Sequence, residues 1–174
     1  MDNGLVTLAN TADDDVLPNL LAPRLRLIFC GMAAGPVSAM LRQYYAGPGY
    51  KFWKVLAEVG LIPDELEPCQ YRQLLSYGIG LTDLVKARSG VDAVLSAADM
   101  GTAELRHRIE CYQPRYLCFN GKRVAEGFLR RPVSYGLQAE RIGATAVFVA
   151  PSTSGAANRW WSIVPWQELA RLSR

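Results

Sequence analysis

The stretch LIFCGMAAG, residues 27–35, decides the fold of this chain. Its apolar first half predicts a short buried strand, and the glycines at positions 31 and 35 frame a turn at the strand's end. In α/β folds such a turn lies at the carboxyl edge of a parallel sheet, where these folds bind their ligands. Small side chains let a flat ligand approach the main chain closely. The aromatic and basic run YAGPGYKFW, residues 45–53, suggests that this ligand carries phosphate.

Strand-like and helix-like segments alternate along the rest of the chain. Strands are expected at residues 26–30, 78–83, 116–120 and 146–150. Helices are expected between them, among others at residues 51–60 and 102–112. This alternation predicts an α/β fold, a three-layer α/β/α sandwich with a central four-stranded parallel sheet. Every strand ends in a turn rich in Gly, Ser, Asn or Asp, so these turns are expected to meet at one edge.

Length and charge predict one domain preceded by a short acidic segment. Residues 1–22 contain four Asp and no Lys or Arg and are expected to form a mobile N-terminal lead-in, while residues 23–174 are expected to form a single domain. The whole chain carries a formal charge of +3, but residues 23–174 alone carry 19 basic and 12 acidic side chains. This excess suits a nucleic-acid partner, although a solvated surface rich in Arg explains it equally well.

Composition excludes several other classes of protein. No apolar run is long enough to span a membrane and no signal pattern opens the chain, so we expect a cytoplasmic protein with no membrane partner. The four cysteines form no C-x-x-C pair, and His107 is not spaced from them as a metal ligand. We therefore expect no metal, no iron–sulfur cluster and no cofactor.

Four short motifs occur in an informative order. They read GMAAG at 31–35 with PGYKFW at 48–53, GIGLTDLV at 78–85, FNGK at 119–122, and PSTSG at 151–155. Together they resemble the uracil-DNA glycosylase superfamily, most closely the mismatch-specific uracil-DNA glycosylase and thymine-DNA glycosylase family, whose first motif reads G-I-N-P-G. Ala33 stands where that family has its catalytic Asn, so the first motif is atypical.

The resemblance implies a base-excision repair enzyme acting on uracil in single-stranded or mismatched duplex DNA. A DNA-repair enzyme of this kind is expected to be a monomer and, in a bacterium, to associate with the nucleoid. Such an enzyme flips the base out and lets water replace it at the sugar, leaving an abasic site. The reaction needs an acceptor that holds and deprotonates this water, which Ala33 cannot supply. Asp83 follows a strand at the same edge of the sheet and is the nearest substitute as catalytic residue. Alternatively, Asp83 caps the segment that follows it.

The remaining candidate substrate contacts lie in the same motifs. Tyr45 matches the aromatic residue that stacks on the flipped base, although packing of the loop with Tyr44 would also explain it. Asn120 is suited to read the edge of a pyrimidine, or simply to form the turn before Gly121. The resemblance further implies substrate contacts from the first motif and from the hydroxyls of the last: Gly31, Met32, Ala33, Gly35, Ser152 and Ser154.

Contacts to the DNA itself are expected from cations and small residues near these motifs: Lys51, Lys122, Gly155, Ala156 and Arg159. Any one of these cations could equally be an ordinary solvated charge. The family's bulky residue that fills the gap left by the flipped base is expected where this chain has Ala156. Arg159 or Trp160 could substitute for it, but Trp160 could also belong to the core.

A second function from a different class fits the same motifs. Loss of the catalytic amide at Ala33 is also what a catalytically silent module would show, one that binds damaged or abasic DNA without cutting it. Asp83 discriminates between the two functions, because a binding module has no use for a carboxylate facing anionic DNA.

Overall fold

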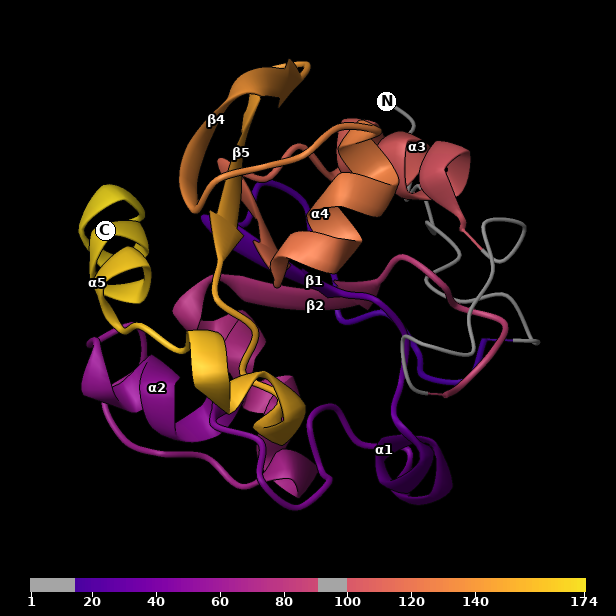
Figure 1. Ribbon diagram of the computed structural model, residues 1–174, viewed down its shortest axis with the longest axis vertical. Helices are drawn as coiled ribbons and strands as arrows, with labels where there is room; N and C mark the ends of the chain where they lie inside the picture. The colour runs from indigo at the N-terminus through magenta and orange to yellow at the C-terminus, as the bar shows by residue number, and fades with distance from the viewer. Residues whose placement is uncertain (1–14, 91–99) are drawn as a thin grey trace, which may run out of the picture.

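A five-stranded sheet forms the centre of the molecule (Figure 1). The computed structural model describes residues 15–90 and 100–174. The strand order is β2-β1-β3-β5-β4, with bounds β1 Leu27–Gly31, β2 Ile79–Asp83, β3 Tyr116–Asn120, β4 Gly136–Ile142 and β5 Thr145–Ala150. The strands β2, β1, β3 and β5 run parallel, and β4 is antiparallel to β5. The sheet is therefore mixed, with a parallel core and one antiparallel edge.

The expectation of a four-stranded parallel sheet is wrong in one strand. The predicted parallel strands are present within a residue of their expected bounds, but β4 was not expected. Its sequence GLQAERI mixes polar and apolar residues because only one of its edges is paired and most of its side chains are at least partly exposed. A tight turn through Gly143, whose φ is +57°, returns the chain into β5.

Helices cover both faces of the sheet. Alternate strand residues point to opposite faces, so Phe29 and Cys118 lie in a first core while Ile28, Cys30 and Phe119 lie in a second. The first core is closed by α2 (Phe52–Glu58), the 3₁₀ helix η1 (Pro68–Tyr77) and α5 (Val164–Leu172), and the second by α3 (Thr102–Tyr112) and α4 (Lys122–Leu129). None of the helices in the described ranges is long and apolar enough to cross a membrane.

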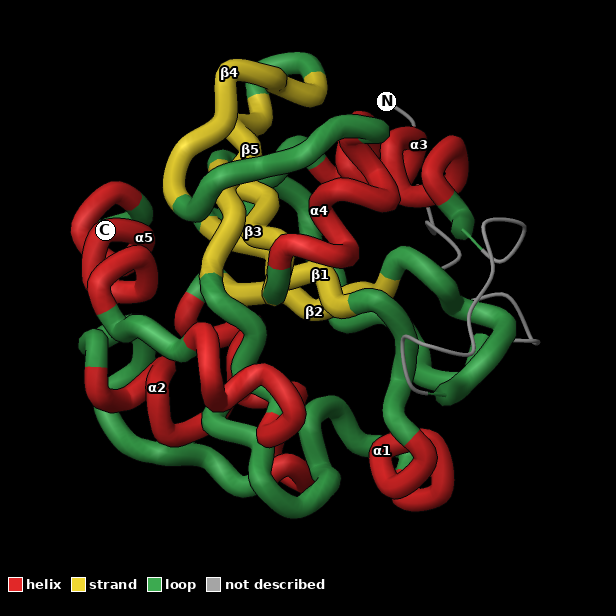
Figure 2. Tube along the Cα trace, in the orientation of Figure 1, coloured by secondary structure: helices red, strands yellow, loops and turns green. Residues whose placement is uncertain are grey.

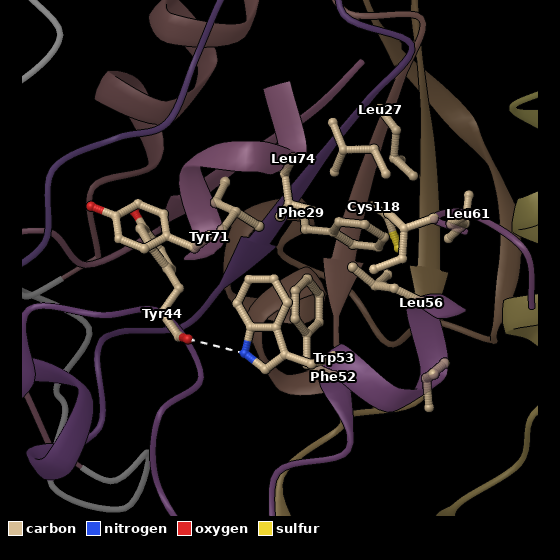
Figure 3. Close-up of a cluster of buried hydrophobic side chains, with 14 of the residues drawn as sticks. Leu27, Phe29, Tyr44, Phe52, Trp53, Leu56, Leu61, Tyr71, Leu74 and Cys118 are labelled. Atoms are coloured by element: carbon tan, nitrogen blue, oxygen red, sulfur yellow. Dashed lines mark hydrogen bonds between the residues drawn. The ribbon is translucent and has the colours of Figure 1, made fainter. Parts of the chain in front are cut away.

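Aromatic side chains pack among the aliphatic residues of the first core, with Phe29, Phe52 and Trp53 close together in it (Figure 3). The Phe29 ring meets the Phe52 ring edge-on at 5.2 Å between centroids and stacks on Trp166 at 5.4 Å. The two indoles also reach the loops: Trp53 Nε1 donates to the Tyr44 carbonyl at 3.3 Å, and Trp166 Nε1 donates to the Pro151 carbonyl at 3.0 Å. The core thereby fixes the loops that follow β1 and β5.

Residues 16–21, which the sequence places in the acidic lead-in, are part of the packed body. Leu17, Leu20 and Leu21 are buried. Leu20 exchanges two backbone hydrogen bonds with Leu81 of β2, at 2.8 and 2.9 Å, and Val16 donates its amide to Lys86. This segment therefore covers the otherwise open edge of β2. Residues 1–14 of the lead-in lie outside the described residues.

The amino edge of the sheet is tied together by Arg26, which immediately precedes β1. Its guanidinium donates to three backbone carbonyls from distant parts of the chain: Leu61 at 2.6 Å, Tyr77 at 2.7 Å and Ser173 at 3.3 Å. One charged side chain thus joins the end of η1 to the segments that follow α2 and α5, at the amino edge of the sheet.

Candidate active site

The carboxyl ends of the parallel strands bring the predicted residues to one edge. Gly31 ends β1 and pairs in register with Asp83, which ends β2. Asn120 ends β3 and pairs with Ala150, which ends β5. Between β1 and α2 the chain is mostly loop, with only the short helix α1 (Pro36–Leu41) in it (Figure 2). Another short helix, the 3₁₀ helix η4 (Gly155–Trp160), follows β5.

The loop of the first motif is held by the segment that follows β2. Leu84, Val85 and Gly90 donate their amides to the carbonyls of Gly31, Met32 and Ala34, at 2.7 to 3.0 Å. The Met32 side chain is buried in the second core, so this residue can face a ligand only through its main chain. Ala33, at the position of the family's Asn, is partly exposed. The loop is thus pinned through its carbonyls on one side.

Asp83 lies directly against the main chain of the first motif. Its side chain is buried, at 5 % exposure. A Cβ placed on Gly31 would stand 2.8 Å from Asp83 Oδ1, so the carboxylate occupies the space that the glycine leaves free. The amides of Leu84 and Val85 donate to backbone carbonyls and are not available to be capped by Asp83. The carboxylate therefore faces the first motif.

Two cations partly compensate the buried charge of Asp83. Burial raises the pKa of the Asp83 carboxyl, while Lys86 and Arg108 act to lower it. Lys86 Nζ lies 3.8 Å from Asp83 Oδ2 and donates to the Tyr44 hydroxyl at 3.1 Å. Arg108 donates to Thr82 Oγ1 at 3.1 Å. Burial in turn lowers the pKa of Lys86, and Asp83 opposes this shift. Sequence reasoning found neither cation.

Tyr45 lies with its ring against Phe52 and its hydroxyl at the strand ends. The two rings stack at 4.0 Å between centroids, with an interplanar angle of 28°. The hydroxyl oxygen lies 3.3 Å from the position of a Cβ on Gly31, beside Asp83. One face of the ring is therefore occupied by Phe52, and the hydroxyl lies beside Gly31 and Asp83 at the strand ends.

Asn120 shapes the loop that follows β5. Its amide donates to Thr153 Oγ1 at 2.9 Å and accepts from the Thr153 amide at 3.1 Å. The neighbouring hydroxyls accept from the same loop: Ser152 Oγ from the Ser154 amide at 3.2 Å, and Ser154 Oγ from the Ala156 amide at 3.3 Å. Each hydroxyl retains its own hydrogen as a donor, because it acts only as an acceptor in these bonds.

A groove of about 320 Å³ runs beside this edge. It is bounded by the start of α1, by the loop 47–50 and by the start of η4; of the predicted site residues, Gly35, Ser154, Gly155 and Ala156 line it. The two loops touch backbone to backbone, since a Cβ on Gly49 would lie 3.5 Å from Gly155 Cα. Asp83 and Tyr45 do not line the groove.

The predicted cations belong to segments next to the groove or after the strand ends, but none of them lines the groove. Lys51 donates to Asn158 Oδ1 and lies 5.4 Å from the centre of the Trp161 ring. Lys122, at the start of α4, lies 4.5 Å above the Tyr135 ring. Arg159 lies 5.7 Å from the ring of Trp160, which is 62 % exposed. Trp160 therefore does not belong to the core.

Metal ligands do not converge in the described part of the chain: residues 15–90 and 100–174 contain no group of three or more His, Cys, Asp or Glu that could hold an ion. Cys30 and Cys118 are buried in the sheet, whereas Cys69 and Cys111 are exposed. Burial strongly raises the pKa of both sheet thiols, so they remain protonated.

Comparison with known proteins gives a family and a fold. The family model described as the uracil DNA glycosylase superfamily matches residues 18–171. The chain is also similar to the solution NMR structure of a proposed uracil DNA glycosylase from Methanosarcina acetivorans, with a TM-score of 0.65 and 23 % sequence identity. This similarity covers 91 % of the present chain and 94 % of the other. At that level of identity, it shows a common fold.

Proposed function

This chain belongs to the uracil DNA glycosylase superfamily, and on that basis we propose that it hydrolyses the N-glycosidic bond of uracil in DNA to leave an abasic site. Single-stranded and mismatched DNA are the proposed substrates, because Ala156 is too small to fill the gap left by a flipped base and unpaired bases flip at the lowest cost. One observation carries the proposal: a buried carboxylate, Asp83, lies against the main chain of the first motif, where Ala33 provides no polar side chain.

The chemistry follows from what bond cleavage demands. As the bond between C1′ and the base nitrogen breaks, the electron pair leaves with the base and the sugar becomes cationic. An ionised Asp83 would favour the cationic sugar and accept a proton from the attacking water, whose oxygen bonds to C1′. Lys86 and Arg108 lower the pKa of this carboxyl and so oppose the effect of its burial. The reaction consumes water alone.

The substrate contacts are assigned to the main chain and the last motif. The main chain of Gly31, Met32, Ala33 and Gly35 would meet the nucleotide, while Ser152 and Ser154 would donate to the base or its phosphate. In this proposal Asn120 offers its second amide hydrogen to the base, since Thr153 takes the first; without substrate, the Asn120 amide acts on the Tyr45 hydroxyl oxygen. The groove lined by Gly155 and Ala156 would take the adjoining strand, with phosphates near Lys51, Lys122 and Arg159.

The first test measures uracil excision by wild type and Asp83→Asn. End-labelled single-stranded and G·U duplex DNA, each with one uracil, would be incubated with the protein and then treated with alkali to cut abasic sites. We expect cleavage at the uracil by wild type and a rate lower by about 100-fold or more in Asp83→Asn, the usual effect of removing a positioned catalytic group. Asp64→Asn, which alters an exposed carboxylate, serves as the matched control and should keep the full rate.

Two other results would have definite meanings. Excision that survives in Asp83→Asn would keep the glycosylase and refute the role of Asp83. No cleavage of either substrate, with DNA binding intact in a gel-shift assay, would favour the silent binding module, for which Asp83→Asn should bind DNA as well as or better than wild type.

A further inference from the structure

Tyr45 combines two features that packing alone does not explain. Its φ is +52°, a left-handed conformation that is uncommon for a bulky side chain. Its hydroxyl is buried, and no acceptor for its proton is found within the part of the chain that the structure describes; the Asn120 amide acts on the hydroxyl oxygen as a donor. A buried hydroxyl without a partner loses its hydration with no compensation. The fold thus holds an unpaired O–H group at the ends of the strands.

The surroundings of this hydroxyl indicate which kind of acceptor would suit its proton. Around Gly31, the Tyr45 hydroxyl and Asp83 Oδ1 lie within 3.3 Å of one point, the place where a Cβ would stand. The ring is held from behind by Phe52, which is fully buried and stacks on it at 4.0 Å. The hydroxyl is therefore fixed beside the carboxylate, and the partner that suits it is an oxygen that becomes negatively charged during the reaction.

We propose that the Tyr45 hydroxyl donates a hydrogen bond to the carbonyl oxygen of the departing base and so stabilises the anion formed as the glycosidic bond breaks. This inference rests on the proposed function and assigns a second catalytic residue to it. The electron pair of the bond moves onto the base, Tyr45 keeps its proton while donating, and the base anion takes its proton from solvent after release. Asp83 then acts on the sugar and its attacking water, and Tyr45 acts on the departing base.

The protonation state of Tyr45 suits this role. Burial and the charge of Asp83 raise the pKa of its phenol well above the ordinary value, while the Asn120 amide acts in the opposite direction. Tyr45 is therefore protonated wherever Asp83 is ionised near neutral pH. A neutral O–H donor and an ionised acceptor can coexist at this edge of the sheet.

The test compares Tyr45→Phe with wild type on two leaving groups. Single-turnover rates would be measured on single-stranded DNA containing either uracil or 5-fluorouracil, whose anion is more stable. A donor to the leaving base matters less when the base leaves easily. We expect Tyr45→Phe to lose about 10- to 100-fold on uracil and clearly less on 5-fluorouracil. The variant should fold, because it loses only an unpaired hydroxyl and keeps the ring.

Tyr71→Phe is the matched control, because the Tyr71 hydroxyl is also buried and unpartnered but lies in the first core beside Tyr44. It should keep the full rate on both bases. An equal loss by Tyr45→Phe on both bases would overturn the proposal and indicate a role toward water or in packing. Full activity of Tyr45→Phe would overturn it too. Failure of wild type to excise either base would instead refute the proposed glycosylase, and the role of Tyr45 with it.

Discussion

Arg26 before strand β1 and Asp83 beside its end differ in how the fold satisfies a charge. The Arg26 guanidinium has three backbone acceptors at 2.6 to 3.3 Å, which join elements far apart in sequence. The Asp83 carboxylate is more deeply buried, and the cation nearest to it, Lys86 Nζ, is 3.8 Å away. Next to it the proton of the Tyr45 hydroxyl has no acceptor among the described residues. At the amino end of β1 the charged group makes three hydrogen bonds. At the carboxyl end, polar groups are buried with an incomplete set of partners.

Polar groups left incompletely paired in a buried place oppose folding, so a fold retains them only where the rest of the structure determines their position. At the carboxyl edge, the position of Tyr45 is fixed by the stack of its ring on Phe52. The position of Gly31 is fixed by the backbone hydrogen bonds that its loop accepts. We therefore expect changes at the Asp83 end to affect the reaction first, and changes at the Arg26 end to affect stability first.

Gly31→Ala should produce the largest effect on the reaction, and it alters only the Asp83 end of β1. The new Cβ would stand 2.8 Å from Asp83 Oδ1 and 3.3 Å from the Tyr45 hydroxyl, so both groups must shift. We expect uracil excision to fall by about 100-fold or more under single-turnover conditions. Gly127→Ala is the matched control: its Cβ would meet its neighbours at ordinary distances of 3.5 to 3.7 Å, and its rate should be unchanged. Full activity of Gly31→Ala would contradict the expectation that changes at the Asp83 end affect the reaction first.

Arg26→Met should produce the reverse pattern, a loss of stability with the chemistry intact. It removes the donor shared by the Leu61, Tyr77 and Ser173 carbonyls, so the free energy of unfolding should fall by about 3 kcal/mol. Denaturant unfolding measures this change, and the excision rate per folded molecule should stay at the wild-type value. Arg171→Met, on the exposed side of α5, should change neither quantity. If fully folded Arg26→Met excised uracil more slowly than wild type, the Arg26 and Asp83 ends of β1 would be coupled.

The pH dependence gives a smaller but sharper comparison. Because the pKa of Asp83 is raised, excision should decline on the acid side with a midpoint above the ordinary Asp value of about 4. Lys86→Met removes a cation that lowers this pKa, so it should move the midpoint to higher pH. The pH–rate profiles of the two proteins on single-stranded uracil DNA check this. An unchanged midpoint in Lys86→Met would mean that the acid limb does not report Asp83.

The same group links stability to pH with a definite sign. The folded state binds the Asp83 proton more tightly than the unfolded state does, so this contribution to stability is present below the unfolded pKa and is lost as the pH rises through the folded one. Relative to Asp83→Asn, wild type should therefore lose stability as the pH rises from acid toward neutral, which urea unfolding across that range would show.

Much of the fold could be predicted from the sequence because the parallel strands are buried on both faces. Each therefore reads as an apolar run that ends in a turn residue, and β3 was placed at residues 116–120 as found. The edge strand β4 gave no such signal, because its side chains alternate between partial burial and exposure. Gly143, which lies between the β4 and β5 segments, was the sequence feature that could have indicated a hairpin.

The site could be predicted only as far as strand ends define it. Asp83 could be placed at the edge because it follows a strand, but its cations could not. Lys86 was indicated only by its position three residues after Asp83. Arg108 comes from α3, and where α3 lies depends on how this helix packs against the sheet. The position of the Tyr45 hydroxyl over Gly31 likewise depends on the ring of Phe52 and on a left-handed backbone that no sequence pattern announces.

The two cores also differ in when a chain leaving the ribosome could complete them. The second core draws on strands and helices up to residue 149, whereas the first needs Trp166 against Phe29 and the Ser173 carbonyl for Arg26. A nascent chain halted before α5 would therefore leave Phe29 and Phe52 without the cover of Trp166, while its other face is already closed. During synthesis, that aromatic face is where a chaperone would find its binding surface, and its closure by α5 marks the end of that exposure.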